Sequence, residues 1–336
     1  MISRTSPVPA LLILFLLITP AIFGQLTGPA DSIKLEKKLS ILNKKLYLYF
    51  PANAVNSPRV ADIMAADPNE NRETRIIADW GKMKLVLFAQ ELFALSGNNL
   101  FEDISKEIEP DFDFQRRRML DSDSLVAVLS TPSLFDSTAG GILVNSFLVK
   151  TQDNTVCRID AYINPEAWPQ KEEFIHLTEN IFKTVSKGDR TVNLNAREET
   201  YPVSPKGKLL FKLPKNYFVT IDEKYDFTVF KLTRYKDLLD KSFSSITIYA
   251  GYHPSLFHKD YGFTDSNAVK VKGKFLDKTL DWQYYVDEPN KFYLKEQLIP
   301  SENIDKGLIL HIALLANKKD LLEEVTKIVG DIKLVK

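Results

Sequence analysis

Two short segments, KLYLYFPAN at 45–53 and KLLFKLPKN at 208–216, place lysine, leucine, proline and asparagine at matching positions. Each segment is typical of an apolar strand that its proline ends, because proline has no N–H to give to a strand ladder. The recurrence indicates that the chain begins the same structure twice.

The two halves of the chain also end alike. A strand at 156–163 comes before 174–185, where apolar residues recur at helical spacing. A strand at 307–315 likewise comes before 321–332, which has the same helical spacing. We therefore expect two diverged copies of one domain, each closed by a strand and then an amphipathic helix.

The segments between these landmarks predict hairpins of antiparallel strands and a short helix at 101–108. The predicted class is α+β, with each domain a mainly antiparallel sheet that is covered by helices and closed by a C-terminal helix. We expect a first domain at 40–188, a linker at 189–206 that holds two prolines, and a second domain at 207–336. The further strands are expected at 81–95, 124–130, 142–150, 226–232, 245–252, 268–273, 280–286 and 292–299.

The first 24 residues have the pattern of a secretory signal. Arg4 supplies one positive charge, and an apolar run from Ala10 to Phe23 follows it. This run is shorter than the about 20 residues that cross a bilayer as a helix. We expect cleavage before Gln25 and an extracytoplasmic protein, periplasmic or secreted, without stable membrane insertion. The alternative that stays open is an uncleaved anchor, which would make the chain a membrane-tethered structural protein.

Charge and cysteine content narrow the classes of partner. The chain has 44 basic and 44 acidic residues, and loss of residues 1–24 would remove only Arg4, which leaves a net charge of −1. Such a balance does not attract nucleic acid, so none is expected as a partner. Cys157 is the single cysteine, which excludes an intramolecular disulfide and favours a small buried side chain in a strand.

Two of the four histidines lie in one loop, GYHPSLFHKDYG at 251–262. His253 and His258 accompany Asp260 there, next to Tyr252, and loops are where binding residues concentrate. A metal-dependent hydrolase built on His253, His258 and Asp260 is one hypothesis. The five-residue spacing of the histidines matches no zinc motif, and a site would need a third ligand from elsewhere, so no metal is predicted.

The other two histidines, His176 and His311, lie in a predicted helix and a predicted strand, where a structural role is expected. No nucleotide-binding, nucleophile-elbow or zinc-protease motif occurs in the chain, so no cofactor and no catalytic residue are predicted. Trp282 and Tyr284 share one face of a predicted strand. They are expected either in the core or on a face that a partner covers.

The order of strand–proline segment, hairpins and closing helix, and above all INPEAWPQKEEFIHLTENIFKTVSKG at 163–188, resembles the PsbP/Mog-type α/β/α sandwich. The resemblance covers about 40–188 and 207–336, and it implies tandem domains of that type. Proteins of this family are mostly noncatalytic accessory or binding proteins, which is the function that the resemblance implies for this chain.

The leading hypothesis is thus an exported, soluble, noncatalytic binding or accessory protein whose partner is another protein or an envelope component. The hydrolase and the tethered structural protein are its alternatives. The predicted binding surface consists of Tyr252, His253, His258, Asp260, Trp282 and Tyr284.

Overall fold

The computed structural model of the chain describes residues 33–42, 44–56, 72–80, 83–97, 100, 117–122, 125–130, 133–136, 140–204 and 207–335. The predicted signal at 1–24 and the predicted helix at 101–108 lie outside these residues. The chain divides into two compact units. The first domain is Met1–Val192 with Asp237–Leu239, and the second is Asn193–Lys236 with Asp240–Lys336.

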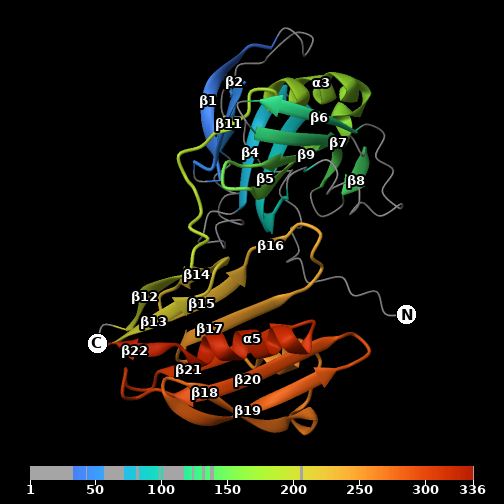
Figure 1. Ribbon diagram of the computed structural model, residues 1–336. Helices are drawn as coiled ribbons and strands as arrows, with labels where there is room; N and C mark the ends of the chain where they lie inside the picture. The colour runs from blue at the N-terminus through green and yellow to red at the C-terminus, as the bar shows by residue number, and fades with distance from the viewer. Residues whose placement is uncertain are drawn as a thin grey trace. The chain divides into compact units, whose positions relative to one another are not determined.

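The first domain consists of two antiparallel sheets and one closing helix (Figure 1). The small sheet has the order β1-β2-β11, and the large sheet has the order β3-β4-β5-β10-β9-β7-β6, with β8 beside β9. The elements are β1 (Leu35–Ile41), β2 (Leu46–Pro51), β3 (Val55–Asn56), β4 (Arg72–Trp80), β5 (Met83–Leu95), β6 (Arg117–Ser122), β7 (Leu125–Ser130), β8 (Leu134–Asp136), β9 (Gly141–Lys150), β10 (Thr155–Ile163), η2 (Pro165–Gln170), α3 (Lys171–Phe182) and β11 (Ser186–Lys187).

The second domain has a small sheet of order β12-β13-β22 and a large sheet of order β14-β15-β17-β21-β20-β19-β18. Its elements are β12 (Arg197–Ser204), β13 (Gly207–Leu213), β14 (Tyr217–Glu223), β15 (Phe227–Arg234), β17 (Ser244–Gly251), α4 (Phe257–Asp260), η3 (Asp265–Asn267), β18 (Val269–Phe275), β19 (Lys278–Asp287), β20 (Phe292–Pro300), β21 (Ile309–Ala316), α5 (Lys319–Gly330) and β22 (Lys333–Val335). The short strand β16 (Lys236–Asp237), which contains Asp237 of the first domain, pairs with β5 in the large sheet of the first domain.

The two domains share one connectivity. When the seven strands on the main path of each large sheet are numbered along the chain, without the short β8 and β16 that lie off it, both paths run in the same spatial order. In both domains the small sheet joins the two opening strands to the strand that follows the closing helix. This is the arrangement that two copies of one domain would have, and a duplication as its origin stays a prediction.

Equivalent asparagines hold equivalent strands in place. The amide oxygen Oδ1 of Asn164, after β10, accepts the Lys84 N–H at 2.7 Å, and the Asn164 N–H donates to the Lys84 carbonyl at 3.4 Å. Asn317, after β21, makes the same two hydrogen bonds with Phe243, at 2.7 and 3.0 Å. Each asparagine therefore fixes the start of a neighbouring strand at the point where the chain turns into the closing helix.

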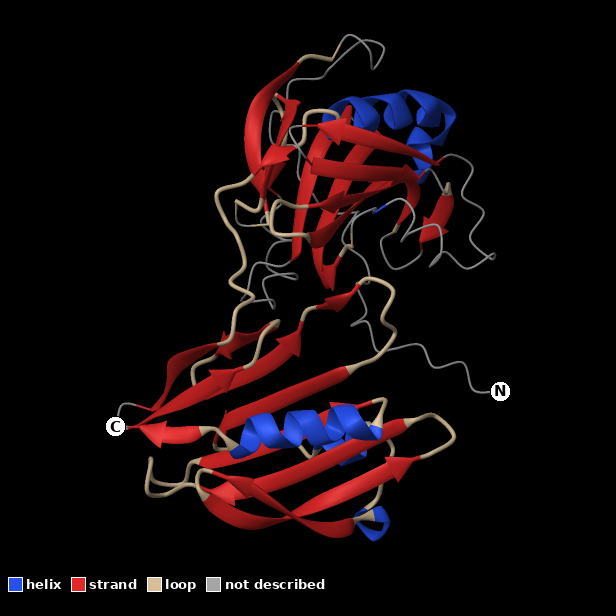
Figure 2. Cartoon of the chain, viewed as in Figure 1, coloured by secondary structure: helices blue, strands red, loops and turns tan. Residues whose placement is uncertain are grey.

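The predicted fold class is wrong, because the chain is mostly β and, among the described residues, each domain has one long helix where a covering layer of helices was predicted (Figure 2). The second layer in each domain is a small antiparallel sheet to which a single long helix is added. Part of this layer comes from the segment predicted as a linker. There, residues of β12 alternate between partly buried and exposed, and β12 pairs along β13. The alternation of burial along β12 is therefore that of a strand packed on one side.

The core of the first domain lies between its large sheet and α3. Phe147 of β9 stacks on Phe182 of α3, with ring centroids 4.3 Å apart and an angle of 7° between the rings. Cys157 belongs to the same core, and burial, as the largest cause, raises the pKa of its thiol to about 12. Both the predicted strand and the predicted helix at the end of this half are therefore in place.

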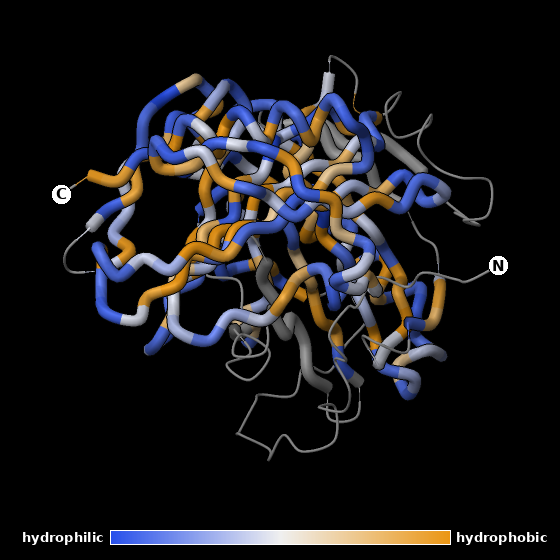
Figure 3. Tube along the Cα trace, turned by 90° about the horizontal axis from the view of Figure 1, so that it is seen from below, coloured by the Kyte–Doolittle hydropathy of each residue, from blue (hydrophilic) through white to orange (hydrophobic). Residues whose placement is uncertain are grey.

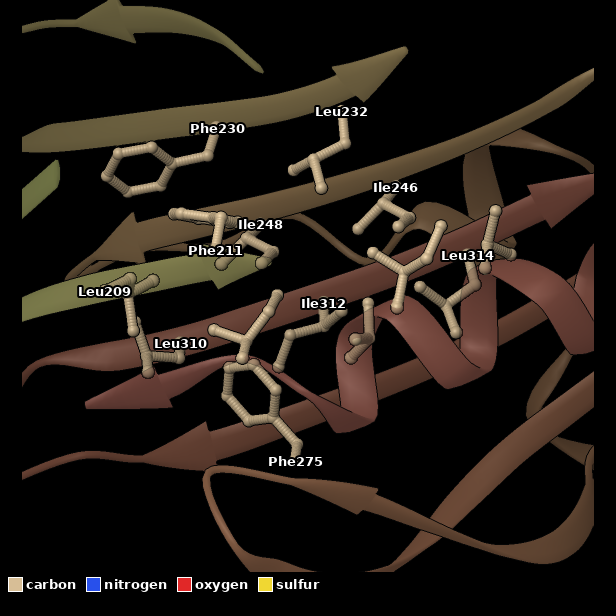
Figure 4. Packing of buried hydrophobic residues seen from close by; sticks show 14 of the residues in the cluster. Leu209, Phe211, Phe230, Leu232, Ile246, Ile248, Phe275, Leu310, Ile312 and Leu314 are labelled. Atoms are coloured by element: carbon tan, nitrogen blue, oxygen red, sulfur yellow. The ribbon is translucent and has the colours of Figure 1, made fainter. Parts of the chain in front are cut away.

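The core of the second domain is formed by alternate residues of β15, β17 and β21 that face α5 and the small sheet (Figure 4). Figure 3 shows how hydrophobic and hydrophilic stretches are interspersed along the described trace. Each fully buried aliphatic or aromatic side chain stabilises the fold by about 1.5–3 kcal/mol. The labelled members of this core are Leu209, Phe211, Phe230, Leu232, Ile246, Ile248, Phe275, Leu310, Ile312 and Leu314.

Trp282 of β19 belongs to this core and is only 1% exposed. Its indole lies beside Gly273 on the adjacent strand β18. A Cβ atom at position 273 would stand 2.6 Å from the indole Nε1 and 2.7 Å from Cδ1, so only glycine leaves room for the ring.

Replacement of Gly273 by Ala is expected to lower the free energy of unfolding by about 1–3 kcal/mol, the usual penalty of overpacking. Urea denaturation of the full chain measures the change. Gly330→Ala is the matched control, because its added Cβ would stand 3.6 Å from the Lys274 Cβ, an ordinary contact. Equal midpoints for the two variants would contradict the packing described for Trp282.

Candidate functional site

The loop that follows β17 begins at a tightly packed glycine. A Cβ atom at Gly251 would lie 2.5 Å from the Tyr249 hydroxyl and 2.6 Å from the Phe227 Cβ. The backbone N–H of His253 donates to the same Tyr249 hydroxyl at 3.2 Å. The loop therefore leaves the sheet in a fixed direction, with the side chains of Tyr252 and His253 exposed.

The short helix α4 carries His258 back onto the sheet. Its two first N–H groups, those of Phe257 and His258, donate to the Glu296 carboxylate at 2.8 and 3.2 Å. Glu296 lies on β20 and is completely buried, with an exposed fraction of 0%. The carboxylate thus supplies acceptors that the first turn of a helix lacks internally.

The same carboxylate receives two imidazoles. His258 Nδ1 lies 2.6 Å from Glu296 Oε2, and His311 Nε2 of β21 lies 2.6 Å from Oε1. Burial, the largest influence, raises the pKa of Glu296, but the hydrogen bonds and charges of His311 and His258 outweigh it and leave the pKa below its usual value. Glu296 is therefore an ionised acceptor of four hydrogen bonds inside the domain.

The outer nitrogens of the two rings are less well paired. His258 Nε2 lies 3.1 Å from Asp265 Oδ1, within ion-pair distance, but the contact lacks hydrogen-bond geometry. His311 Nδ1 has no hydrogen-bond partner in the described part of the chain. The His258 ring stacks on Tyr285, with centroids 4.9 Å apart and an angle of 10°. We call His258, Glu296 and His311 the His–Glu–His cluster.

The cluster lies on the face of the large sheet that is opposite α5. Around it pack apolar residues of the 252–268 segment and of β19, β20 and β21, so both faces of the central strand β21 are buried. The segment predicted as a binding loop is therefore the cover of the second sheet face, held by the His–Glu–His cluster. The residues of this second core are Tyr285, Leu294, Ala313 and Leu315, with Phe257, Phe263, Ala268 and Phe292 against them.

The structure does not unite the six residues of the predicted binding surface. Trp282 is in the core on the α5 face, and Tyr284 packs half-buried against that same core. His258 is 1% exposed on the opposite face, whereas Asp260 is exposed. Tyr252, His253 and Asp260 are exposed, so they are the part of the prediction that a partner can reach.

The predicted hydrolase arrangement is not assembled by this loop. His258 points into the domain at Glu296, and Asp260 is exposed at the end of α4. Within the described ranges, no group of three or more His, Cys, Asp or Glu side chains could hold a metal ion. His176 lies exposed on α3, apart from this cluster.

Glu296 was absent from the predicted residues, although the sequence contains a signal for it. In FYLKEQLI, Glu296 lies between Leu294 and Leu298 in the row of residues on one face of the strand. A carboxylate in that row needs buried donors, and a histidine in the neighbouring apolar strand is a natural source. The sequence alone does not show that β20 pairs with β21, which is what brings His311 to Glu296.

Two exposed and two partly buried aromatic residues lie at the end of the large sheet where β15 begins and β17 ends. Phe227 pairs with Gly251 in the strand register, and the Lys224 N–H donates to the Phe227 carbonyl at 2.8 Å, which closes the β14–β15 hairpin. Phe227 and Tyr249 stack with centroids 5.3 Å apart. We call Tyr225, Phe227, Tyr249 and Tyr252 the tyrosine end.

Two rings of the tyrosine end face outward. Tyr225, at the tip of the hairpin, has a relative exposure of 106%, and Tyr252 has 40%. The Tyr252 ring lies beside Gly307 of the β20–β21 loop, 3.7 Å from where a Cβ would stand, and its hydroxyl is 3.5 Å from Asp305. Two aromatic rings are thus presented on a framework fixed by strand pairing.

No family model matches the sequence, and no curated protein matches it. The chain is similar to the apo structure of the immunity protein TplEi of T6SS from Pseudomonas aeruginosa, with a TM-score of 0.22, 12% identity, and coverage of 88% of this chain and 96% of that chain. It is also similar to a chain in the crystal structure of the Tle4–Tli4 complex, with a TM-score of 0.21, 12% identity, and coverage of 88% and 97%. TM-scores this low establish neither a shared fold nor a shared function.

Among the residues that the structure describes, none of the helices is long and apolar enough to cross a membrane.

Replacement of Glu296 by Gln is expected to lower the free energy of unfolding at pH 7 by about 3–5 kcal/mol, because two imidazoles and two N–H groups lose a charged buried acceptor. The folded pKa lies below the ordinary value of 4.5, so the contribution of Glu296 is present above that pH and is lost as the pH falls through the folded pKa. Urea midpoints between pH 7 and pH 3 should therefore fall less steeply for Glu296→Gln than for the native chain.

The exposed Glu323 of α5 supplies the control. Glu323→Gln should keep both the native midpoint and the native pH dependence. A Glu296→Gln variant as stable as this control at pH 7 would show that the carboxylate does not hold the 252–268 segment.

Proposed function

We propose that this chain is an exported, noncatalytic binding protein and that a protein partner docks on the tyrosine end of the second domain. The observation that supports this most directly is the complete exposure of Tyr225 at the same end of the sheet as the partly exposed Tyr252. Tyrosine and tryptophan dominate the energetics of protein interfaces because they bury a large area with few rotatable bonds.

The setting of the two rings favours binding. Tyr225 is on a hairpin closed by strand pairing, and Tyr252 follows a glycine whose surroundings admit no side chain. A ring held on such a framework loses little conformational entropy when a partner covers it. The Tyr225 ring serves no packing purpose within the domain, since it is fully exposed, and 40% of Tyr252 also remains exposed.

An extracytoplasmic location is part of the proposal, and the support for it is the charged and then apolar sequence of residues 1–24. The tyrosine end replaces the six-residue surface predicted from sequence, of which Tyr252 and His253 are retained as accessible neighbours. His258 is assigned a structural role in the His–Glu–His cluster.

The Tyr225→Ala, Tyr252→Ala double variant is expected to lose capture of the partner while its thermal midpoint stays within about 2 °C of the native value, because surface truncations rarely change stability by more than about 0.5 kcal/mol. The measurement is affinity capture from the native envelope fraction with tagged native and variant chains, followed by quantitative mass spectrometry.

Phe243→Ala is the matched control. Phe243 is 46% exposed and precedes β17, at the opposite end of the same sheet. Proteins that the native chain and Phe243→Ala both capture, and that the tyrosine variant loses, are the expected partners. Identical captured sets for all three chains would refute docking at the tyrosine end.

A further inference from the structure

The loops around the tyrosine end have an excess of negative charge. The hairpin residues 222–226 and the β20–β21 loop residues 301–307 together contain five acidic and two basic side chains. One of the two basic residues, Lys224, is paired with Asp222 at 3.1 Å. The acidic residues are Asp222, Glu223, Asp226, Glu302 and Asp305.

Three of these carboxylates have no ion-pair or hydrogen-bond partner in the described part of the chain: Glu223, Asp226 and Glu302, all of them exposed. The opposite end of the same sheet differs. Its loops 240–243, 287–291 and 317–320 contain four acidic and four basic residues. The negative charge is therefore a property of the end that displays the tyrosines and not of the domain surface as a whole.

Two tyrosine rings elsewhere in the chain have a lysine ammonium over them. The Lys38 ammonium lies 4.8 Å from the centre of the Tyr47 ring, and that of Lys319 lies 5.6 Å from the Tyr293 ring. The exposed face of Tyr225 has no such cation over it in the described residues. A ring with an open face, flanked by unpaired carboxylates, attracts a guanidinium or ammonium group through both the ring quadrupole and the local charge.

We infer that the partner presents a basic segment, rich in arginine or lysine, to the tyrosine end; this inference rests on the proposed function. Cationic side chains of the partner lie over Tyr225 and Tyr252, while Glu223, Asp226 and Glu302 pair with them at the rim. Rim charges of this kind raise the rate of association and its dependence on salt more than they raise the final affinity.

The inference is tested on the full chain with a defined probe, a fluorescent peptide of alternating arginine and glycine, and with an alternating glutamate and glycine peptide as its charge-inverted counterpart. The arginine peptide should bind the native chain. Its affinity should be about tenfold lower for the Glu223→Lys, Asp226→Lys variant, and its affinity for the native chain should fall as NaCl rises to about 0.5 M. The glutamate peptide should not bind the native chain. Circular dichroism checks that each variant is folded.

Glu323→Lys combined with Asp331→Lys is the charge-matched control, because both residues are exposed on or after α5. Equal binding of the arginine peptide to the two charge variants, or no binding to the native chain, would overturn the inference. If the tyrosine variant loses its captured protein while Glu223→Lys, Asp226→Lys retains it, the proposed function stands and the basic partner is rejected. If neither variant loses a captured protein, the proposed function itself fails.

Discussion

The structure of the second domain depends on the ionised carboxylate of Glu296. Its strand neighbour β21 is buried on both faces, so the sheet needs a cover opposite α5. The 252–268 segment supplies the cover, but a loop that crosses an apolar face must still satisfy its own backbone N–H groups. Glu296 accepts two of them and also binds His258 and His311, which ties the cover to the sheet at its centre. The direction in which Tyr252 leaves the sheet is set one residue earlier, by the close packing of Gly251 against Tyr249 and Phe227.

In the first domain the buried carboxyl near the equivalent part of the central strand belongs to Asp160 of β10, and its surroundings differ from those of Glu296. Arg158 of β10 precedes Asn164 by the same number of residues as His311 of β21 precedes Asn317, so the two positions correspond. Asp160 lies on the same face of β10 as Arg158. Asp160 is buried, and burial raises its pKa although Ser146 and Arg158 donate to it at 2.6 and 2.9 Å. For Glu296 the effect of burial is outweighed by the hydrogen bonds and charges of His311 and His258, so its pKa is lowered. Two domains with one strand order thus have buried carboxyls whose contributions to stability change with pH in opposite directions.

Much of the architecture was predictable from spacing alone. The apolar period of 174–185 and 321–332 located the closing helices α3 and α5 to within three residues, and the strand–proline segments became β2 and β13. The second layer of each domain was not predictable in this way. In REETYPVS, β12 exposes alternate polar residues and contains a proline, so its composition is that of a loop, and only its pairing with β13 makes it a strand. Pairing between distant segments is a tertiary property, and periodicity does not report it.

Because the sequence does not report tertiary pairing, the residues selected from sequence motifs differ from those that the folded domain leaves exposed. A pair of histidines and an aspartate in a glycine-rich loop attracts attention because these residue types can perform chemistry, yet burial decides whether they meet a ligand. In the second domain His258 and His311 are hydrogen-bonded to the buried carboxylate of Glu296, which would be unstable without such partners. Tyr225 belongs to no motif. Its role in the proposal follows from the pairing of β15 with β17, which brings Tyr225 and Tyr252 to one end of the sheet, and from the exposure of both rings. No local sequence pattern contains these facts. A binding surface made from a strand register and exposed rings therefore has to be found in the folded domain.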